Sequence, residues 1–290
     1  MSFPASLIKA TNKIFKKSSH PLNLQNDGKM SYGEWQYEKA EETLSYYRKK
    51  YPTHRMFENK RVLDLGCGAG GKAVYYATLG AEEVIGVDIL PKYEKEAMSL
   101  AKAHGVEKKF HFYCADAENL PYPDNSFDTI IMNDAMEHIK NPEAVISECM
   151  RLLNDGGLLF INFPPYCHPY GAHLSDAINM PWVHLFFSER ACIEAYTDLV
   201  KDLPDGKERL NLRISCDSRG REYISYINKM TIKKFRRILN KLGLTPEFYT
   251  ETPLRKGLTP LAKIPFTKEP FVKTVTCVIN KKGEGAKKDI

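Results

Sequence analysis

The amino-acid sequence predicts an α/β fold in which a mixed, mostly parallel sheet is covered by helices on both faces and carries an inserted cap. Three observations lead to this prediction. Short apolar runs alternate with helical patterns from residue 61 to residue 163, which is typical of strands that are buried on both faces. A glycine-rich turn joins the first strand to the first helix of this series. The alternation then stops over residues 166–229 and returns afterwards.

The expected elements follow from hydrophobic spacing and from capping residues. A helix is expected over residues 34–50, where apolar side chains recur every three or four positions. Strands are expected at 61–65, 83–87, 110–114, 127–132 and 158–163, and helices at 71–79, 91–104 and 141–153. Asn141 is the expected N-cap of the last of these helices, and Asp155-Gly156-Gly157 is expected to form a turn before the last strand.

The C-terminal part returns to the regular pattern and completes a predicted seven-stranded sheet. Thr231 is expected to cap a helix that ends at Gly243, and closing strands are expected at 244–250 and 271–280. Inside the insertion, a helix is expected from Ser188 to about residue 203. The chain then divides into a tail and lid helix, a core, an inserted cap and a C-terminal part of the core, at 1–55, 56–165, 166–229 and 230–290.

The composition is that of a globular protein. The chain has 290 residues, of which 43% are hydrophobic, so that it can bury a core without disulfides or metal. No stretch approaches the roughly 18 apolar residues of a membrane-spanning helix. The seven cysteines are odd in number, scattered and without a C-x-x-C motif. This pattern predicts a reducing, cytoplasmic location.

The net charge of +6 is concentrated at the two ends of the sequence. Residues 1–20 contain four lysines and no acidic residue, residues 281–290 add an excess of lysine, and the rest is balanced. A nucleic-acid partner is therefore not expected, because such proteins usually carry basic charge on the fold itself. Residues 5–17 are interpreted first as a frayed basic terminus. The alternative is a helix with an apolar face between lysines, which would contact a membrane surface or a partner.

The turn after the first strand carries a phosphate- or nucleoside-binding pattern. Gly66, Gly68 and Gly71 satisfy G-x-G-x-x-G, in which glycine lets the backbone turn tightly and approach a ligand. Asp88 ends the second strand, where a carboxylate can accept hydrogen bonds from ribose hydroxyls. These features are shared by proteins that bind NAD and proteins that bind S-adenosylmethionine, so both cofactors remain open on them alone.

Two further acidic residues favour S-adenosylmethionine. Asp64 lies two residues before Gly66, where its carboxylate can face the amino group of the methionine part. The same carboxylate would repel the pyrophosphate of NAD. Asp116 follows the third strand, where it can accept from the adenine amine while the adjacent backbone reads a ring nitrogen.

With these motifs in order over residues 60–165, the chain resembles the class I S-adenosylmethionine-dependent methyltransferases, most closely the type-11 group of ubiquinone and menaquinone biosynthesis enzymes. The resemblance implies a Rossmann-like fold, a lid helix within residues 20–50 and S-adenosyl-L-methionine as cofactor. It also implies a set of cofactor-binding residues, namely Asp64, Gly66, Cys67, Gly68, Gly70, Asp88, Ile89, Asp116, Ala117 and Asn133. Cys67 is expected to act there as a small filler and not as a nucleophile.

Methyl transfer is an in-line displacement in which the protein mainly aligns the acceptor and excludes water. An acceptor that must lose a proton benefits from a base, usually histidine. His173 is the preferred candidate base, and His168 and His138 are the other candidate catalytic residues. The expected acceptor-binding residues are aromatic or histidine side chains, namely Tyr37, Tyr166, Tyr170, Trp182 and His184.

Asp134, Glu137 and His138 resemble the metal-binding element of some O-methyltransferases. A Glu-His-Ile sequence also occurs in type-11 enzymes without metal, and Asp134 is one methylene shorter than the usual glutamate. We therefore expect no metal at this position.

The sequence as a whole predicts a methyltransferase for a small or medium organic molecule. The alternatives are an RNA or protein methyltransferase, an NAD-dependent oxidoreductase and a non-catalytic protein that binds S-adenosylmethionine. The acceptor atom and the oligomeric state do not follow from the sequence.

Overall fold

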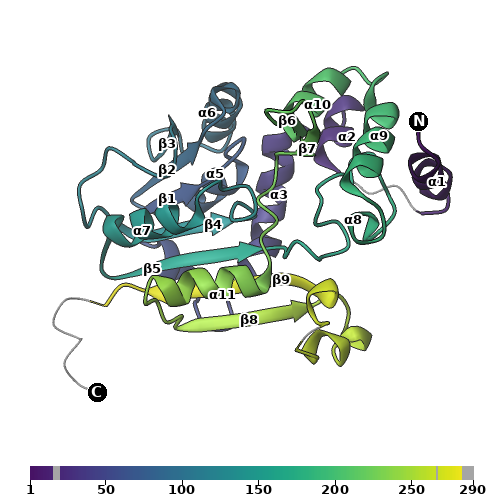
Figure 1. Ribbon diagram of the computed structural model, residues 1–290. Helices are drawn as coiled ribbons and strands as arrows, with labels where there is room; N and C mark the ends of the chain where they lie inside the picture. The colour runs from purple at the N-terminus through teal and green to yellow at the C-terminus, as the bar shows by residue number, and fades with distance from the viewer. Residues whose placement is uncertain (16–19, 266, 283–290) are drawn as a thin grey trace. The chain divides into compact units, whose positions relative to one another are not determined.

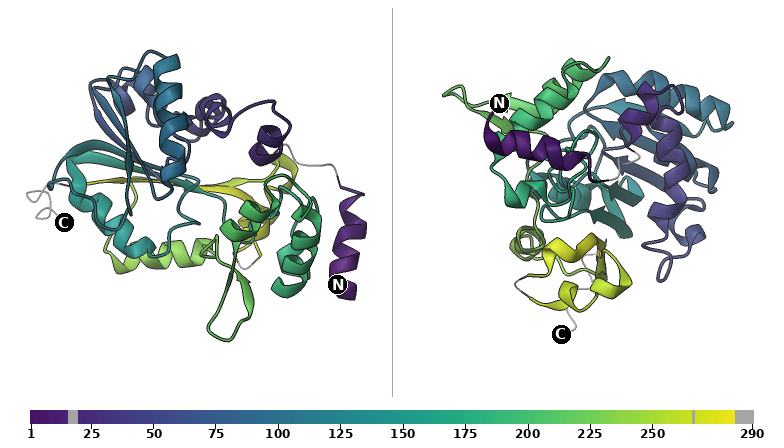
Figure 2. Two further views of the ribbon diagram at one scale, coloured as in Figure 1. Left: turned by 90° about the horizontal axis from the view of Figure 1, so that it is seen from above. Right: turned by 90° about the vertical axis from the view of Figure 1, so that its right-hand side faces the viewer.

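The computed structural model describes residues 1–15, 20–265 and 267–282 (Figures 1 and 2). These residues form two compact units. The sheet unit comprises Tyr32–Phe163, Phe235–Glu251 and the described residues from Val275 on. The helical unit comprises Pro164–Lys234, Thr252–Thr274 and the described residues of Met1–Ser31. None of the described helices is long and apolar enough to cross a membrane.

The predicted seven-stranded mixed sheet is confirmed, with the strand order β3-β2-β1-β4-β5-β9-β8 (Figure 1). Neighbouring strands from β3 to β5 pair in parallel, and β9 pairs with β5 in antiparallel orientation. The strands are β1 (Arg61–Leu65), β2 (Glu83–Asp88), β3 (Phe110–Cys114), β4 (Phe127–Asn133), β5 (Leu153–Phe163), β8 (Phe248–Pro253) and β9 (Val272–Asn280).

Helices cover both faces of the sheet, as expected for strands that are apolar on both sides. In Figures 1 and 2, α3 (Tyr32–Leu44) and α5 (Gly71–Thr78) lie on one face, whereas α7 (Pro142–Leu152) and α11 (Ile232–Lys241) lie on the other. The remaining helices of this unit are α4 (Thr53–Phe57), the short 3₁₀ helix η1 (Pro91–Tyr93) and α6 (Glu94–Ala103). On the α5 face, the ring of Tyr76 stacks on Phe57 with 4.9 Å between ring centroids.

Most predicted helix ends are confirmed by their capping contacts. The Asn141 side chain accepts from the backbone N–H of Ala144, and the Thr231 hydroxyl accepts from that of Lys234. Gly80, Gly105 and Gly243 follow helices with positive φ, a conformation in which glycine has no steric penalty.

Two predicted elements are wrong in their bounds. The helix expected over 34–50 ends at Leu44, because Tyr47 and Tyr51 pack their rings edge-on against Phe160 of the sheet. The expected turn at Asp155-Gly156-Gly157 is part of β5. Phe127 pairs with Leu153 and Thr129 with Leu158, so the extra residues of β5 form a bulge.

The last expected strand pair also differs from the prediction at its start. β8 begins at Phe248 and not at residue 244, and β9 begins at Val272. Both strands end at or close to their expected positions, so the sheet closes as predicted.

The helical unit is built from segments that are far apart in the sequence. Its elements are α1 (Phe3–Asn12), α2 (Pro21–Asn26), α8 (Val183–Phe186), α9 (Glu189–Val200), α10 (Gly206–Arg213), β6 (Ile214–Cys216), β7 (Glu222–Ile224), η2 (Lys256–Leu258), η3 (Leu261–Lys263) and η4 (Glu269–Phe271). The helix predicted from Ser188 is α9, and the Ser188 side chain accepts from the backbone N–H of Ala191.

A buried ion cluster joins these segments around Asp176. Its carboxylate accepts from Arg209 at 2.9 Å and from the Tyr196 hydroxyl at 2.8 Å, and Arg213 lies at 3.4 Å. The side chains of Asp176, Arg209 and Arg213 are at most 3% exposed. Burial lowers the pKa of the neighbouring His20 to about 4, so this imidazole is neutral near pH 7 and adds no third cation.

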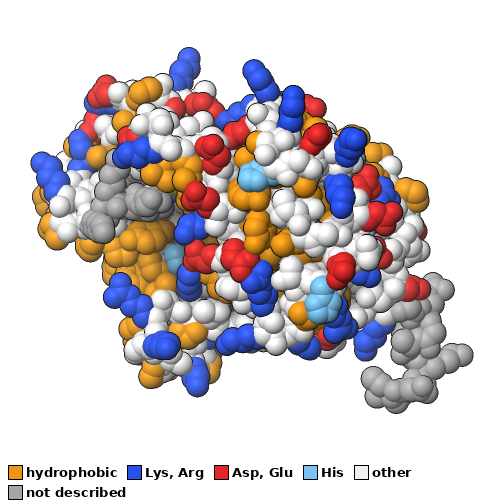
Figure 3. Space-filling view, turned by 180° about the vertical axis from the view of Figure 1, so that it is seen from behind, with side chains coloured by type: hydrophobic (Ala, Val, Ile, Leu, Met, Phe, Trp, Pro, Cys, Tyr) orange, Lys and Arg blue, Asp and Glu red, His pale blue; other side chains and the backbone are white. Residues whose placement is uncertain are grey.

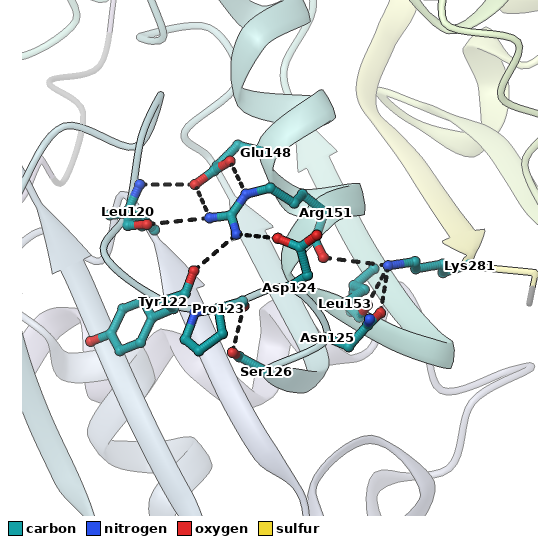
Figure 4. Close-up of polar contacts among 10 residues, drawn as sticks. All are labelled: Leu120, Tyr122, Pro123, Asp124, Asn125, Ser126, Glu148, Arg151, Leu153 and Lys281. Carbon is teal, nitrogen blue, oxygen red and sulfur yellow. Dashed lines mark hydrogen bonds and ion pairs between the residues drawn. The ribbon is translucent and has the colours of Figure 1, made fainter.

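In the sheet unit, a single arginine holds the loop that leads into β4 (Figure 4). The Arg151 guanidinium donates to the backbone carbonyls of Leu120 and Tyr122 and to the carboxylates of Asp124 and Glu148. Glu148 in turn accepts from the backbone N–H of Leu120. These bonds hold the pKa of Glu148 below its usual value and fix the loop against α7.

Arg151→Leu should therefore lower the free energy of unfolding by about 2–4 kcal/mol, because two backbone carbonyls and the largely buried Glu148 carboxylate lose their donor. Arg190→Leu is the matched control: Arg190 is 88% exposed and pairs only with Glu194, so its loss should cost less than about 0.5 kcal/mol. Urea unfolding measures both variants. Equal stability of the two would show that the Arg151 network contributes nothing.

Candidate functional site

The carboxyl ends of the parallel strands β1 to β4 form the candidate cofactor site. β1 lies between β2 and β4, so the strand order reverses there. In open α/β sheets, ligands bind outside the carboxyl ends at such a point. The expected cofactor residues at the ends of β1, β2 and β3 all lie along this edge.

The glycine loop between β1 and α5 is tied back to β2. The backbone N–H groups of Gly66 and Cys67 both donate to the carbonyl of Val87, at 2.8 and 3.0 Å. Gly70 has φ +77° and precedes the first residue of α5. A Cβ atom at Gly66, which has φ +74°, would lie 2.7 Å from that of Ala135. Glycine is thus required at position 66 both for the turn and for the close approach of Ala135, which follows β4.

Asp88 lies at the end of β2, beside this loop. One carboxylate oxygen accepts from the backbone N–H of Gly68 and the other from that of Leu90, each at 2.9 Å. Each oxygen keeps a further lone pair, so the oriented carboxylate can still accept from two ribose hydroxyls. The side chain of Ile89 follows and is 65% exposed, which suits the predicted contact with an adenine ring.

Asp64, at the tip of β1, is a strongly perturbed acid on this edge. Its side chain is buried, and within the described chain one carboxylate oxygen has no hydrogen-bond partner. Burial and the charge of Asp88 raise the pKa of Asp64 to about 7, although the ammonium of Lys72 acts in the opposite direction. A cation that hydrogen-bonds this oxygen would recover part of the cost of burying the charge.

Lys72 is a site residue that the sequence analysis missed. It lies in the first turn of α5 and is 7% exposed, and its ammonium is 2.7 Å from the Asp134 carboxylate. A lysine is unfavourable at a helix N-terminus, where the helix dipole is positive. The signal in the sequence was this one charged residue among the apolar residues of a helix that begins at the glycine loop.

Gln36 is the second missed residue. Its side-chain amide donates to the carbonyl of Cys67 at 3.1 Å and accepts from the N–H of Gly71 at 3.3 Å. α3 packs so closely that a Cβ at Gly71 would lie 2.0 Å from the carbonyl of Gly33. Gln36 continues the buried row of Ala40 and Leu44, and a polar residue in that row was the signal that could have revealed it.

The third strand contributes the predicted adenine-binding pair. Asp116 is exposed, and its carboxylate accepts from the backbone N–H of Glu118 at 3.0 Å, so the loop after β3 holds it in place. Ala117 is half-buried beside it. Cys67 is 2% exposed and burial raises its pKa well above the usual value, which fits the expected role as a filler.

Two predicted site residues are engaged in packing instead. The Asn133 amide accepts from the Tyr47 hydroxyl at 2.6 Å and donates to the Tyr76 hydroxyl at 2.9 Å, so its side chain points into the core. The ring of Tyr37 stacks on His104, with 3.9 Å between centroids, and meets Tyr75 edge-on. These side-chain positions therefore do not support contact of Asn133 with the cofactor or of Tyr37 with the acceptor.

The acidic cluster after β4 has its own internal partners. The Asp134 carboxylate is paired with Lys72, and its residue has φ +53°. Burial and the charge of Asp134 raise the pKa of Glu137 well above its usual value, and the ring nitrogen of His138 lies 3.9 Å from this carboxyl group. A protonated acid is a poor metal ligand. The absence of a metal remains our prediction.

Of the predicted acceptor residues of the helical unit, Tyr166 and His184 contact one another, with 4.9 Å between their ring centroids. The His184 Nε2–H donates to the Tyr166 carbonyl at 2.7 Å, which leaves Nδ1 as an acceptor. This Nδ1 atom is buried and has no hydrogen-bond partner among the described residues, and burial lowers the pKa of the ring. His184 is therefore neutral near pH 7 and presents an unused acceptor.

The other residues of this segment differ in what they can do. Burial lowers the pKa of His168 to about 4, and its Nδ1 accepts from the backbone N–H of Tyr170. The ring of His173 lies 6.1 Å from that of Tyr226, in a residue with φ +54°. Trp182 donates to the carbonyl of Pro270 at 3.1 Å, which assigns its indole N–H to the structure of this unit.

Comparison with known proteins agrees with this geometry. Residues 63–161, from β1 to β5, match the family model of a methyltransferase domain. They form a class I methyltransferase domain of the type-11 group. The family implies S-adenosyl-L-methionine as the cofactor.

Curated relatives match over the same region. Norajmaline N-methyltransferase of Rauvolfia serpentina is 37% identical over 102 residues, and the chloroplastic tocopherol O-methyltransferase of Arabidopsis thaliana is 32% identical over 123 residues. These alignments cover 35% and 42% of this chain and 35% and 34% of the relatives. The match thus spans about a third of the length of the curated relatives.

Solved structures extend the likeness of the fold. A candidate S-adenosylmethionine-dependent methyltransferase of Listeria monocytogenes superposes with a TM-score of 0.53 at 16% identity, over 84% of this chain and 99% of that one. The cyclase SpnF gives a TM-score of 0.54, also at 16% identity, over 86% of this chain and 82% of that one. At such identity, the likeness establishes the class I methyltransferase fold alone.

The raised pKa of Asp64 predicts how cofactor binding to this domain depends on pH. An ionised Asp64 would accept from the cofactor amino group, so binding lowers its pKa and releases a proton. Affinity for S-adenosylhomocysteine, measured by calorimetry, should rise up to about tenfold per pH unit below pH 7 and level off above it. Asp64→Asn should bind more weakly at pH 8 and lose this dependence. A pH-independent wild type between about pH 6 and pH 8 would contradict the role.

The thermal stability of Asp64→Asn is the control for damage to the fold. A carboxyl group whose pKa is higher in the folded state than in the unfolded state loses stability as the pH rises between the two values. For Asp64 this window runs from about 4 to about 7. Asp64→Asn should therefore have a higher melting temperature than the wild type at pH 8, although it binds less well. A lower melting temperature would show that the variant disturbs the fold.

Proposed function

We propose that this chain is an S-adenosylmethionine-dependent methyltransferase that acts on a small or medium organic molecule with apolar or aromatic character. The observation that carries the proposal is the pair of carboxylates around the glycine loop: Asp64 is buried and short of a donor, and Asp88 is oriented by two backbone N–H groups. The Asp64 carboxylate suits an ammonium group, and the Asp88 carboxylate suits a ribose. The names of the relatives, which give norajmaline and tocopherol as their substrates, support the acceptor class.

The proposed reaction is a single displacement. A lone pair on the acceptor attacks the methyl carbon, the bond from carbon to sulfur breaks, and S-adenosylhomocysteine leaves while the acceptor gives up its proton. The bound cofactor supplies the activated methyl group through its sulfonium. Asp64 would hold the amino group of the cofactor and Asp88 its ribose, and Gln36 fixes α3 on the glycine loop, which excludes water from that side.

Acceptor contacts are assigned to the segment after β5 in the helical unit. Tyr166, Tyr170 and His184 combine aromatic surface with an unused ring nitrogen, which suits an apolar acceptor that carries one polar group. His173 is the proposed base. His168 is a weaker choice, because a base with a pKa of about 4 is mostly proton-free but binds a proton poorly near pH 7.

Physical arguments weigh against the rival functions. A carboxylate at Asp64 would repel the pyrophosphate of NAD. Basic and acidic side chains are interspersed on the face drawn in Figure 3, a distribution that gives no support for a nucleic-acid substrate. The seven cysteines are all unpaired, which supports our proposal of a reducing, cytoplasmic location.

Calorimetry with S-adenosylhomocysteine and NAD tests the cofactor. S-adenosylhomocysteine should bind and NAD should not. Asp88→Ala should weaken S-adenosylhomocysteine binding tenfold or more, because charge-assisted hydrogen bonds to ribose are worth about 1.5–3 kcal/mol each. Asp155→Ala, an exposed acid in the bulge of β5, is the matched control and should bind normally. Tight binding of NAD, or normal affinity of a folded Asp88→Ala, would refute the assignment.

Turnover separates an enzyme from a protein that only binds the cofactor. Incubation with labelled S-adenosylmethionine and a cell extract, followed by mass spectrometry, should yield a methylated product and identify the acceptor. No transfer to any extract component, despite cofactor binding, would favour the non-catalytic alternative.

His173→Ala tests the proposed base. It should lower turnover about 10²–10⁴-fold and change S-adenosylhomocysteine affinity little. His111→Ala, a half-exposed histidine of β3, is the control and should behave as the wild type. A stable His173→Ala variant with normal turnover would remove His173 from the mechanism, and joint loss of melting temperature and binding would assign it to the fold.

A further inference from the structure

Helix α1 presents an apolar face that the described core of the helical unit does not cover. Ala5 and Ile8 are fully buried against α9 on one side of the helix. On another side, Phe3 is 81% exposed and Leu7 41% exposed. Ala10 continues this row at helical spacing, and Ile14, 78% exposed, extends it into the following turn. These four residues, Phe3, Leu7, Ala10 and Ile14, are called the α1 stripe below.

Polar contacts fix the orientation of α1, so the stripe cannot turn inward. The backbone N–H of Ser2 donates to the Glu194 carboxylate of α9 at 2.9 Å. At the other end, the Asn12 side chain donates to the carbonyl of Ala177 at 2.7 Å. Between them, Lys9 pairs with Asp198 of α9. Rolling the helix to bury the stripe would break all three contacts and expose Ile8.

The charge around the stripe is positive. Lys13 is exposed next to Ile14 and makes no ion pair within the described chain. The acids of α9 that face α1 are already paired: Glu194 with Arg190, and Asp198 with Lys201 as well as with Lys9. Residues 1–20 of the sequence contain four lysines and no acid.

We propose that the α1 stripe docks reversibly on a membrane surface that contains anionic lipids. A helix with exposed Phe, Leu and Ile side chains and flanking lysines lies in the plane of the interface, with its apolar side chains among the acyl chains and its lysines near the lipid phosphates. Two copies of the chain are a poorer fit for the same surface, because stripe-to-stripe contact would bring their lysines together. The docking goes beyond the proposed methyl transfer and does not depend on it.

Vesicle co-sedimentation of the full chain tests the proposal. The wild type should bind vesicles of phosphatidylcholine with about 30% phosphatidylglycerol at least tenfold more tightly than vesicles of phosphatidylcholine alone. The double substitution of Phe3→Ser and Ile14→Ser should lower binding to the anionic vesicles by tenfold or more, because each removes a large apolar side chain from the interface. Lys13→Glu should also weaken binding, and added salt should reduce the difference between the two vesicle types.

Leu7→Ser and Leu261→Ser form a matched pair within the same unit. Leu7 is 41% exposed and lies in the stripe, whereas Leu261 is 38% exposed and lies in η3. Only Leu7→Ser should reduce vesicle binding, and both should keep the wild-type melting temperature and S-adenosylhomocysteine affinity. Equal binding to neutral vesicles, unchanged binding of the stripe variants, or a lipid-free dimer that the stripe variants dissociate would each overturn the proposal.

Discussion

A buried carboxylate at the tip of the central strand is the constraint on which the candidate site depends. Asp64 is held there by β1 in a place where its charge is costly, with its pKa raised to about 7. Lys72 and Asp88 act on that charge in opposite directions. The site is therefore incomplete in an electrostatic sense until a cation arrives. A buried charge without a donor costs stability, a cost that functional sites commonly carry.

Helix α3, which we propose as the lid helix, belongs to the site because it hydrogen-bonds the backbone of the glycine loop. Gln36 supplies both a donor and an acceptor to the backbone of that loop, and Gly71 permits α3 to approach within contact of α5. A segment outside the matched family region of 63–161 thus completes the cofactor-binding loop. Substitutions in α3 would act on cofactor binding even if no residue of α3 touched the cofactor.

The sequence predicted what local patterns determine, and missed what distant contacts determine. Strands β1 to β4, the glycine loop and the caps at Asn141, Ser188 and Thr231 depend on neighbouring residues, and they were found. Asn133 and Tyr37 were placed in the site because their positions in the chain fit, but Tyr47, Tyr76 and His104 come from other elements and take up their side chains. The early end of α3 has the same cause, since Phe160 draws Tyr47 and Tyr51 out of the helical path. In the sequence, Lys72 and Gln36 stand out only as polar residues among apolar positions of a helix. A single sequence does not distinguish such a buried polar residue from an exposed one.

The fold itself does not determine the reaction, because a cyclase shares it with methyltransferases at equal similarity to this chain. What separates such proteins is the chemistry presented to the second substrate, which we propose lies here in the helical unit. This unit has its own core and its own buried ion cluster at Asp176, which joins Asn23 of α2 to Arg209 of α10. Asp176, Arg209 and Arg213 stabilise that arrangement only as a set, because the loss of one leaves a buried charge unpaired. The proposed acceptor segment around Tyr166 and His184 therefore belongs to a unit with its own core, whereas Asp64 and Asp88 belong to the sheet unit.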